Sequence, residues 1–166
     1  MEKANENNLF SIRRDMMKYN VKMLAYCGIY CEQCSGKLAR DEQSTKHLEH
    51  IPFPWAQIDL SERSCEGCKG EYCVCNVKCN IKPCALSKGI DSCADCDSFP
   101  CEHIEAFSND GIPHHKSAIG NLHTIREHGV DFWYKNLKPA LKCHCGERQS
   151  WYYTCPTHSQ DNGKQV

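Results

Sequence analysis

The chain has 166 residues with 20 basic and 21 acidic side chains, so its formal net charge is −1. This length accommodates one domain, or one domain with a small appendage. The balanced charge gives neither the basic surface that non-specific nucleic-acid binding requires nor attraction to an anionic membrane. No apolar run approaches the roughly 20 residues that span a bilayer, and the polar start MEKANENNLF is unlike a secretory signal.

Cysteine is the unusual part of the composition, with 15 residues of this type. Large aliphatic side chains are sparse, so we expect a modest apolar core whose missing stability comes from bound metal. Many cysteines without a secretory signal favour a reducing compartment and metal ligation over disulfides. The expected location is therefore cytoplasmic, and a secreted, disulfide-rich domain is the alternative.

The first predicted element lies in residues 1–20, an N-terminal extension that is disordered at its start. Apolar side chains then recur at steps of three and four residues, which is the period of a short amphipathic helix. These side chains are Leu9, Ile12, Met16 and Tyr19. We interpret this stripe as a packing face.

The core, residues 21–110, begins with a short strand-like segment over residues 21–26 (VKMLAY). Residues 35–50 contain good helix formers, so a helix is predicted there. Pro52 and Pro54 cannot continue that helix. From residue 61 to 101, closely spaced Cys and Gly predict metal-binding turns with one short helix around residues 85–89.

The remaining elements are predicted to be helical until the tail. A tight corner at residues 98–101 (SFPC) precedes a helix that begins with EHIEAF. In the helical segment, residues 111–140, residues 111–115 form a loop. Apolar residues then recur with helical period over residues 116–137, interrupted at Gly129. Pro139 separates these helices from a small tail, residues 141–166.

Short cysteine spacings give the core its metal-binding signal. Two thiolates separated by two residues chelate one ion easily, and two such pairs place four sulfurs at about 2.3 Å from zinc. Twelve central cysteines would fill three four-sulfur sites, although spacing alone leaves their pairing open. They are Cys27, Cys31, Cys34, Cys65, Cys68, Cys73, Cys75, Cys79, Cys84, Cys93, Cys96 and Cys101.

The tail carries a fourth candidate site. Its ligands are Cys143, Cys145, Cys155 and His158, three cysteines and one histidine arranged like a zinc ribbon. With the core this predicts three or four zinc ions. The alternative for the tail is a reduced, partly exposed thiol cluster. The whole chain is therefore expected to be a small metal-organised fold of α+β or irregular type, with several helices around cysteine-ligated sites and a zinc-ribbon-like tail.

An iron–sulfur centre is the main alternative to zinc. Cys27, Cys31 and Cys34 have the C-x3-C-x2-C spacing with which radical S-adenosylmethionine enzymes hold a [4Fe–4S] cluster. Those enzymes resemble one another in a much longer partial barrel and usually have an aromatic residue where this chain has Gln33. A structural zinc site is favoured, but four-thiolate sites accept either zinc or an iron–sulfur cluster.

Three segments resemble the family called domain of unknown function 3795. They are AYCGIYCEQCSGKLA, CEGCKG and CNIKPCALSKGIDSCADCDSFPCEHIEAF, and the resemblance extends over about residues 24–158. The family usually has a cysteine where this chain has Asn76, which leaves open whether Cys73 or Cys75 is a ligand. Relatives tend to end with a second C-x2-C, whereas this chain has His158. The resemblance implies metal binding and no particular reaction.

The sequence thus predicts a zinc-binding structural or interaction module with a protein partner, and it does not indicate an enzyme. No Ser–His–Asp order, phosphate-binding glycine loop or paired carboxylates stand out. Two alternatives remain. One is an iron–sulfur redox protein or enzyme centred on Cys27, Cys31 and Cys34; the other is a metal store or chaperone. The oligomeric state is left open.

Overall fold

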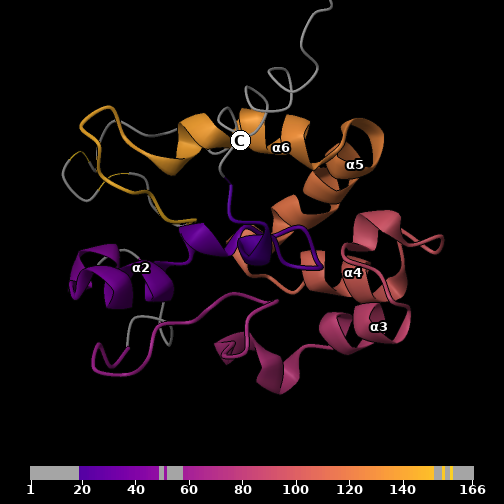
Figure 1. The fold of residues 1–166 in the computed structure, drawn as a ribbon, viewed down its shortest axis with the longest axis horizontal. Coiled ribbons are helices and arrows are strands. Elements are labelled where there is room, and N and C mark those ends of the chain that lie inside the picture. The colour runs from indigo at the N-terminus through magenta and orange to yellow at the C-terminus, as the bar shows by residue number, and fades with distance from the viewer. Residues whose placement is uncertain (1–18, 49–50, 52–57, 152–154, 156–157, 159–166) are drawn as a thin grey trace, which may run out of the picture.

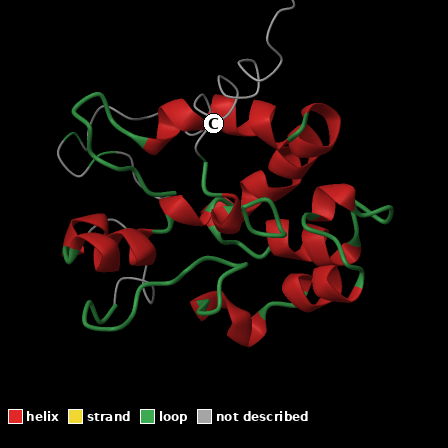
Figure 2. Ribbon diagram, viewed as in Figure 1, coloured by secondary structure: helices red, strands yellow, loops and turns green. Residues whose placement is uncertain are grey.

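The computed structural model describes residues 19–48, 51, 58–151, 155 and 158. Within these residues the chain forms five α-helices, seven short 3-10 helices and no sheet (Figure 1 and Figure 2). The α-helices are α2 (Ser35–Glu42), α3 (Ile81–Ser87), α4 (Glu102–Ser108), α5 (Ala118–His128) and α6 (Val130–Leu137). The 3-10 helices are η1 (Val21–Met23), η2 (Cys31–Gln33), η3 (Thr45–Leu48), η4 (Val74–Lys78), η5 (Cys93–Asp95), η6 (Pro113–Ser117) and η7 (Lys138–Leu141).

The described residues therefore confirm a small, helical, cysteine-rich protein but lack the β part of the predicted α+β class. Extended pairing there is limited to two isolated bridges, Leu24 with Tyr30 and Lys142 with Arg148. The strand-like segment predicted at residues 21–26 begins instead as η1, and its chain reverses at Gly28 before it can pair further. The helix predicted within residues 9–19 lies almost entirely outside the described residues.

Helix α2 ends eight residues earlier than the sequence predicts. Gln43 adopts a left-handed conformation with φ of 49°, and the backbone N–H of Ser44 donates to the carbonyl of Ala39 at 3.0 Å. This pairing satisfies a carbonyl at the helix end. The chain then forms η3 in place of the last two predicted turns. The Gln43 side chain donates to the carbonyls of Arg40 at 2.7 Å and Leu60 at 3.0 Å, so long-range contacts fix this end.

The predicted helical stripe over residues 116–137 is confirmed, including its interruption. Helices α5 and α6 meet at Gly129, whose φ of 85° is accessible to glycine and unfavourable for other residues. The short helix predicted around residues 85–89 lies slightly earlier, as α3, and α4 begins where expected. The loop predicted at residues 111–115 is in part the 3-10 helix η6.

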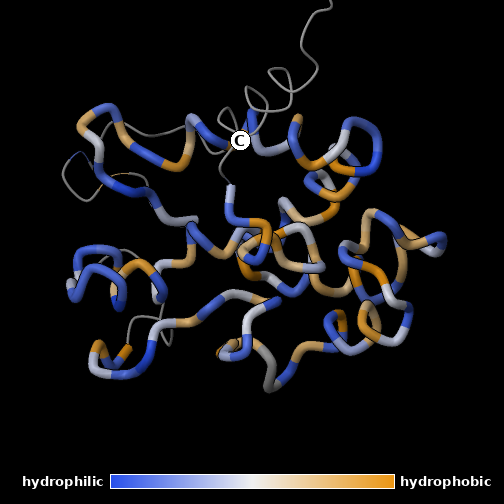
Figure 3. The backbone as a smooth tube through the Cα atoms, viewed as in Figure 1, coloured by the Kyte–Doolittle hydropathy of each residue, from blue (hydrophilic) through white to orange (hydrophobic). Residues whose placement is uncertain are grey.

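The main core lies where α5 and α6 meet residues 27–34, which we call the first cysteine turn. Leu24, Ile104 and Leu122 are fully or almost fully buried there, and the Tyr30 ring packs edge-on against Trp133 at 5.8 Å between centroids. Short apolar stretches alternate with hydrophilic ones along the chain (Figure 3). Cys93 and Cys96 belong to the same buried cluster. Sulfur and hydrocarbon therefore share one core.

The first cysteine turn is seated directly on α5. Gly28 has φ of +84°, and a Cβ at this position would come within 2.9 Å of the Leu122 Cγ. Asn121 donates from Nδ2 to the Gly28 carbonyl at 2.9 Å. The backbone between Cys27 and Cys31 is thus held by close approach to a helix that lies about 90 residues later in the chain. No helix among the described residues is both long and apolar enough to span a membrane.

Candidate metal centre

The structure brings the four predicted tail ligands together. One ligand atom from each of Cys143, Cys145, Cys155 and His158 lies within 4.8 Å of all the others. The Sγ of Cys145 is 3.6 Å from the Sγ of Cys155, and the Nδ1 of His158 is 3.4 Å from the Sγ of Cys155 and 3.6 Å from that of Cys143. Tetrahedral zinc with its usual bond lengths gives edges of about 3.5–3.8 Å. The group therefore fits one ion.

Local backbone geometry presents the first two thiols of this group. The backbone N–H of Cys143 donates to Glu147 at 2.8 Å, and the N–H of Gly146 donates back to Cys143 at 2.9 Å. Gly146 has φ of 92°, which completes the tight turn that Cys143 and Cys145 share. We call this turn, residues 143–147, the tail knuckle.

The other two ligands come from a second turn, and burial differs across the group. The backbone N–H of His158 donates to the Sγ of Cys155 at 3.3 Å, the kind of amide-to-sulfur contact that stabilises a thiolate. Cys155 is fully buried and Cys143 is 8% exposed, whereas Cys145 is exposed to solvent. An ion bound here would be shielded on one side and open on the Cys145 side. The His144 Nδ1 lies 3.4 Å from the Cys143 Sγ, a neighbour that spacing arguments overlooked.

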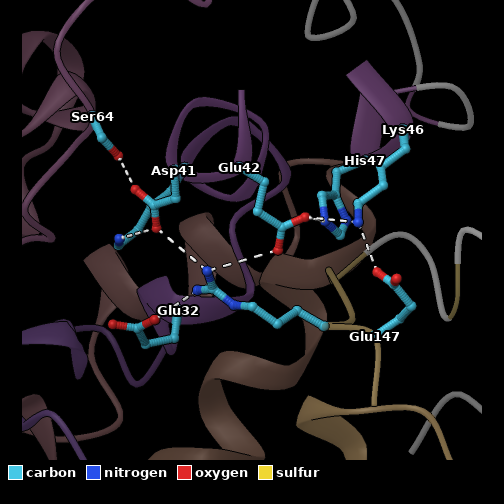
Figure 4. Close-up of polar contacts among 9 residues, drawn as sticks. Glu32, Asp41, Glu42, Lys46, His47, Ser64 and Glu147 are labelled. Carbon is cyan, nitrogen blue, oxygen red and sulfur yellow. Dashed lines mark hydrogen bonds and ion pairs between the residues drawn. The ribbon is translucent and has the colours of Figure 1, made fainter. Parts of the chain in front are cut away.

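A charge network fastens the tail knuckle to α2 (Figure 4). Arg148, which pairs with Lys142 at the base of the knuckle, contacts Glu32 at 2.9 Å, Asp41 at 3.5 Å and Glu42 at 3.9 Å. The Arg148 side chain is 30% exposed, so water screens these pairs only in part. Lysine and neighbouring hydrogen bonds hold the pKa values of the Asp41 and Glu42 carboxyl groups below their usual range, against the effect of burial. Both therefore remain charged partners for Arg148.

A second set of contacts runs beside the first. Lys46 bridges Glu42 at 2.9 Å and Glu147 at 2.7 Å, so both residues that follow Gly146 are tied to the α2–η3 segment. His47 is almost completely buried and its Nε2 lies 2.9 Å from Glu42. The pairs that Lys46 makes with Glu147 and that Arg148 makes with Glu32 join residues more than 100 positions apart, which is why no sequence pattern indicated them.

Trp151 makes the third attachment of the tail. Its backbone N–H donates to the carbonyl of Gln33 at 2.9 Å, inside the first cysteine turn, and its ring stacks on His114 at 4.1 Å between centroids. Burial, together with the charge of His115 and against the opposing effect of Asp110, lowers the pKa of His114 to about 3. His114 is therefore neutral in the folded protein at any ordinary pH.

This neutral histidine predicts a loss of stability in acid. His114 gains a proton near its ordinary pKa of about 6.5 only when the chain unfolds, so the unfolding free energy should fall as pH drops from 6.5 toward 3. The slope from this one group is at most about 1.4 kcal/mol per pH unit. His114→Phe keeps a ring on Trp151 and should flatten the pH dependence of urea unfolding between pH 6.5 and 5. His128→Phe, at an exposed position, is the control, and equal slopes in all three proteins would contradict the prediction.

A comparison with protein families matches residues 23–106, about half of the chain, to the model described as Protein of unknown function (DUF3795). The chain belongs to the DUF3795 family. The resemblance stated from the sequence is thereby confirmed over residues 23–106, and its expected continuation to about residue 158 lies outside the match. The matched part holds all twelve central cysteines but not the tail group. No curated protein and no solved structure matches the chain.

In residues 23–106, which we call the family region, each of the first three cysteines lies near different cysteines. Burial, against a hydrogen bond from the Ile29 backbone and together with the nearby thiols of Cys68 and Cys79, raises the pKa of Cys27 to about 12. The Sγ of Cys31 accepts the backbone N–H of Cys68, while Cys34 neighbours Cys65. Among the described residues, three ligand atoms all within 4.8 Å of one another occur in the tail group and not around these cysteines.

Seven of the nine remaining cysteines of the family region form two neighbourhoods. The Cys65 thiol is hydrogen-bonded to the Cys73 thiol, which is in turn hydrogen-bonded to the Cys75 thiol. Cys73 and Cys75, the two alternative ligands left open by the sequence, therefore lie next to each other. Cys75 is the exposed one of the two. Cys84, Cys93, Cys96 and Cys101 line a common cavity that α3 also borders.

Proposed function

We propose that this DUF3795 protein is a zinc-binding protein whose tail holds one ion in a Cys3His site with a structural role. The observation that carries the proposal is the convergence of Cys143, Cys145, Cys155 and His158 within 4.8 Å. The knuckle is attached to α2 and to the first cysteine turn through Arg148 and Trp151. Zinc at this position would fix where the tail is placed against the family region, and a structural site of this type stabilises the fold directly.

The experiment compares two histidines. His158→Asn should lower the zinc content by one equivalent per chain, because a tetrahedral site that loses one of four ligands binds zinc far more weakly. His128→Asn removes an exposed histidine outside the site and should leave the content unchanged. Elemental analysis for zinc and iron on reduced protein gives the stoichiometry, and far-ultraviolet circular dichroism shows whether the helices persist.

Two results would contradict this proposal. Unchanged zinc content in His158→Asn would mean that the tail group does not hold the ion. Iron with visible absorption in place of zinc would favour the iron–sulfur alternative. Cys143→Ser provides a second test, since it should remove the same single equivalent and leave the family region folded.

Exposure of Cys145 supports a second candidate, a metal store or chaperone. Exchange between proteins requires that an incoming ligand reach the ion, and an exposed thiolate is the route by which it can. A structural site exchanges slowly with a chelator, whereas a transfer site exchanges rapidly. Zinc release to a chromogenic chelator, compared between the wild type and Cys145→Ser, separates the two roles.

A further inference from the structure

A second group of four cysteines surrounds a cavity inside the family region. The cavity has a volume of about 20 Å³, and the sulfur-bearing residues Cys84, Cys93, Cys96 and Cys101 all line it. A space of roughly 10–15 Å³ admits one water-sized particle, so the cavity can take a single ion. Its apolar walls include Ile81 and Ile104, which are both buried.

Three separate elements bring these thiols to the cavity. Cys84 lies in the middle of α3, Cys93 begins η5, and Cys101 immediately precedes α4. Cys93 and Cys96 form a two-residue-spaced pair, in which the backbone N–H of Cys96 donates to the carbonyl of Cys93 at 3.2 Å. This is the chelating turn that the C-x2-C spacing predicts. The other two thiols reach it from the neighbouring helices.

A lysine is directed at the same thiols. The Nζ of Lys88 donates to the Sγ of Cys96 at 3.2 Å, and its charge also interacts with Cys84 and Cys101. A thiolate at Cys96, which is the form that binds metal, accepts such a hydrogen bond from an ammonium group more strongly than a thiol does. Four thiolates around a divalent ion carry a net charge of −2, and one ammonium group beside them offsets part of it.

We infer that Cys84, Cys93, Cys96 and Cys101 form a second metal site, for zinc or another thiophilic metal, with Lys88 as the positioning residue that balances its charge. The site is distinct from the tail site in sequence, in ligands and in surroundings. No three of its sulfurs lie within 4.8 Å of one another in the structure, so the side chains must move toward the cavity to close on a single ion. Cysteine spacing alone left open which of the twelve central cysteines share an ion.

Stoichiometry tests which cysteines share the metal. Cys84→Ser and Cys96→Ser should each remove the metal of one centre, and the double variant should remove no more than either alone. Cys96→Ser combined with Cys143→Ser should remove the metal of two centres, measured by elemental analysis for zinc and iron. Full metal content in both single variants, or twice the loss in the Cys84→Ser/Cys96→Ser variant, would overturn the site. Failure of the tail proposal would appear separately, as no loss in Cys143→Ser alone.

Lys88 supplies a test that leaves all ligands in place. Lys88→Met should retain the metal but release it to a chelator on the order of ten times faster, which is typical when a partner that hydrogen-bonds a ligand is removed. Lys116→Met, at an exposed position elsewhere, is the matched control. Equal release rates for Lys88→Met and the control would remove Lys88 from the site.

The unmodified protein gives an independent readout if the cysteine variants do not fold. In the metal-loaded wild type, all four cysteines should resist alkylation by iodoacetamide, and a chelator should expose them together. Peptide mass spectrometry reads each cysteine separately. Alkylation of Cys84, Cys93, Cys96 or Cys101 in metal-loaded protein at the rate seen after chelation would exclude the site.

Discussion

Removing metal from the intact protein should unfold most of residues 27–101. The two α-helices of this region, α2 and α3, have only eight and seven residues, and isolated helices of this length are not stable in water. Cys27, Cys31 and Cys68 pack against the main apolar cluster, so we expect metal binding by these thiols to be coupled to formation of the core. Structural zinc can contribute on the order of 10 kcal/mol in small domains, and the whole stability of a protein is about 5–15 kcal/mol.

The measurement is circular dichroism and a thermal transition on protein treated with a strong chelator under reducing conditions. We expect loss of the helical signal and of the cooperative transition, with recovery when zinc is restored. Chelator already saturated with zinc is the control, because it adds the same solute without removing metal. Protein that elemental analysis shows to be metal-free, yet with native spectra and transition, would refute the prediction.

The second large effect is expected from Leu122→Ala. Leu122 is fully buried and lies beneath Gly28, so truncation leaves a cavity under the first cysteine turn. Leucine-to-alanine changes in cores cost about 2–5 kcal/mol. Because this side chain supports the backbone that carries Cys27 and Cys31, metal should also be released faster.

Leu86→Ala is the matched control for this change. Leu86 is 57% exposed, so the same truncation should alter the unfolding free energy by no more than about 0.5 kcal/mol. Urea unfolding of the two variants and the wild type, all metal-loaded, measures the difference. If Leu122→Ala were no more destabilising than Leu86→Ala, the contact between α5 and the first cysteine turn would not support the core as described.

The sequence alone predicts those elements that depend only on neighbouring residues. The stripe over residues 116–137 and its break at Gly129 follow from helical period and from the conformational freedom of one glycine. The tail group followed from spacing, because Cys143 and Cys145 share one turn and Cys155 and His158 share another. Membership of the DUF3795 family likewise depended on motifs that are continuous in sequence.

Contacts between distant segments decided the rest. The end of α2 at Gln43 is fixed by a hydrogen bond to Leu60, and the reversal that replaces the predicted strand is fixed by Leu122 against Gly28. Arg148 meets Glu32 across more than 100 residues of chain.

The cysteine pattern shows the same division between spacing and tertiary structure. Spacing indicates which thiols are candidate metal ligands because chelation by one turn is a local property. Which turns could share an ion depends on how the helices pack. Only the tertiary structure shows that Cys84 and Cys101 line the same cavity as Cys93 and Cys96, between α3, η5 and α4. The position of the Lys88 ammonium group beside these thiols also depends on how the helices pack, so the sequence alone did not indicate it.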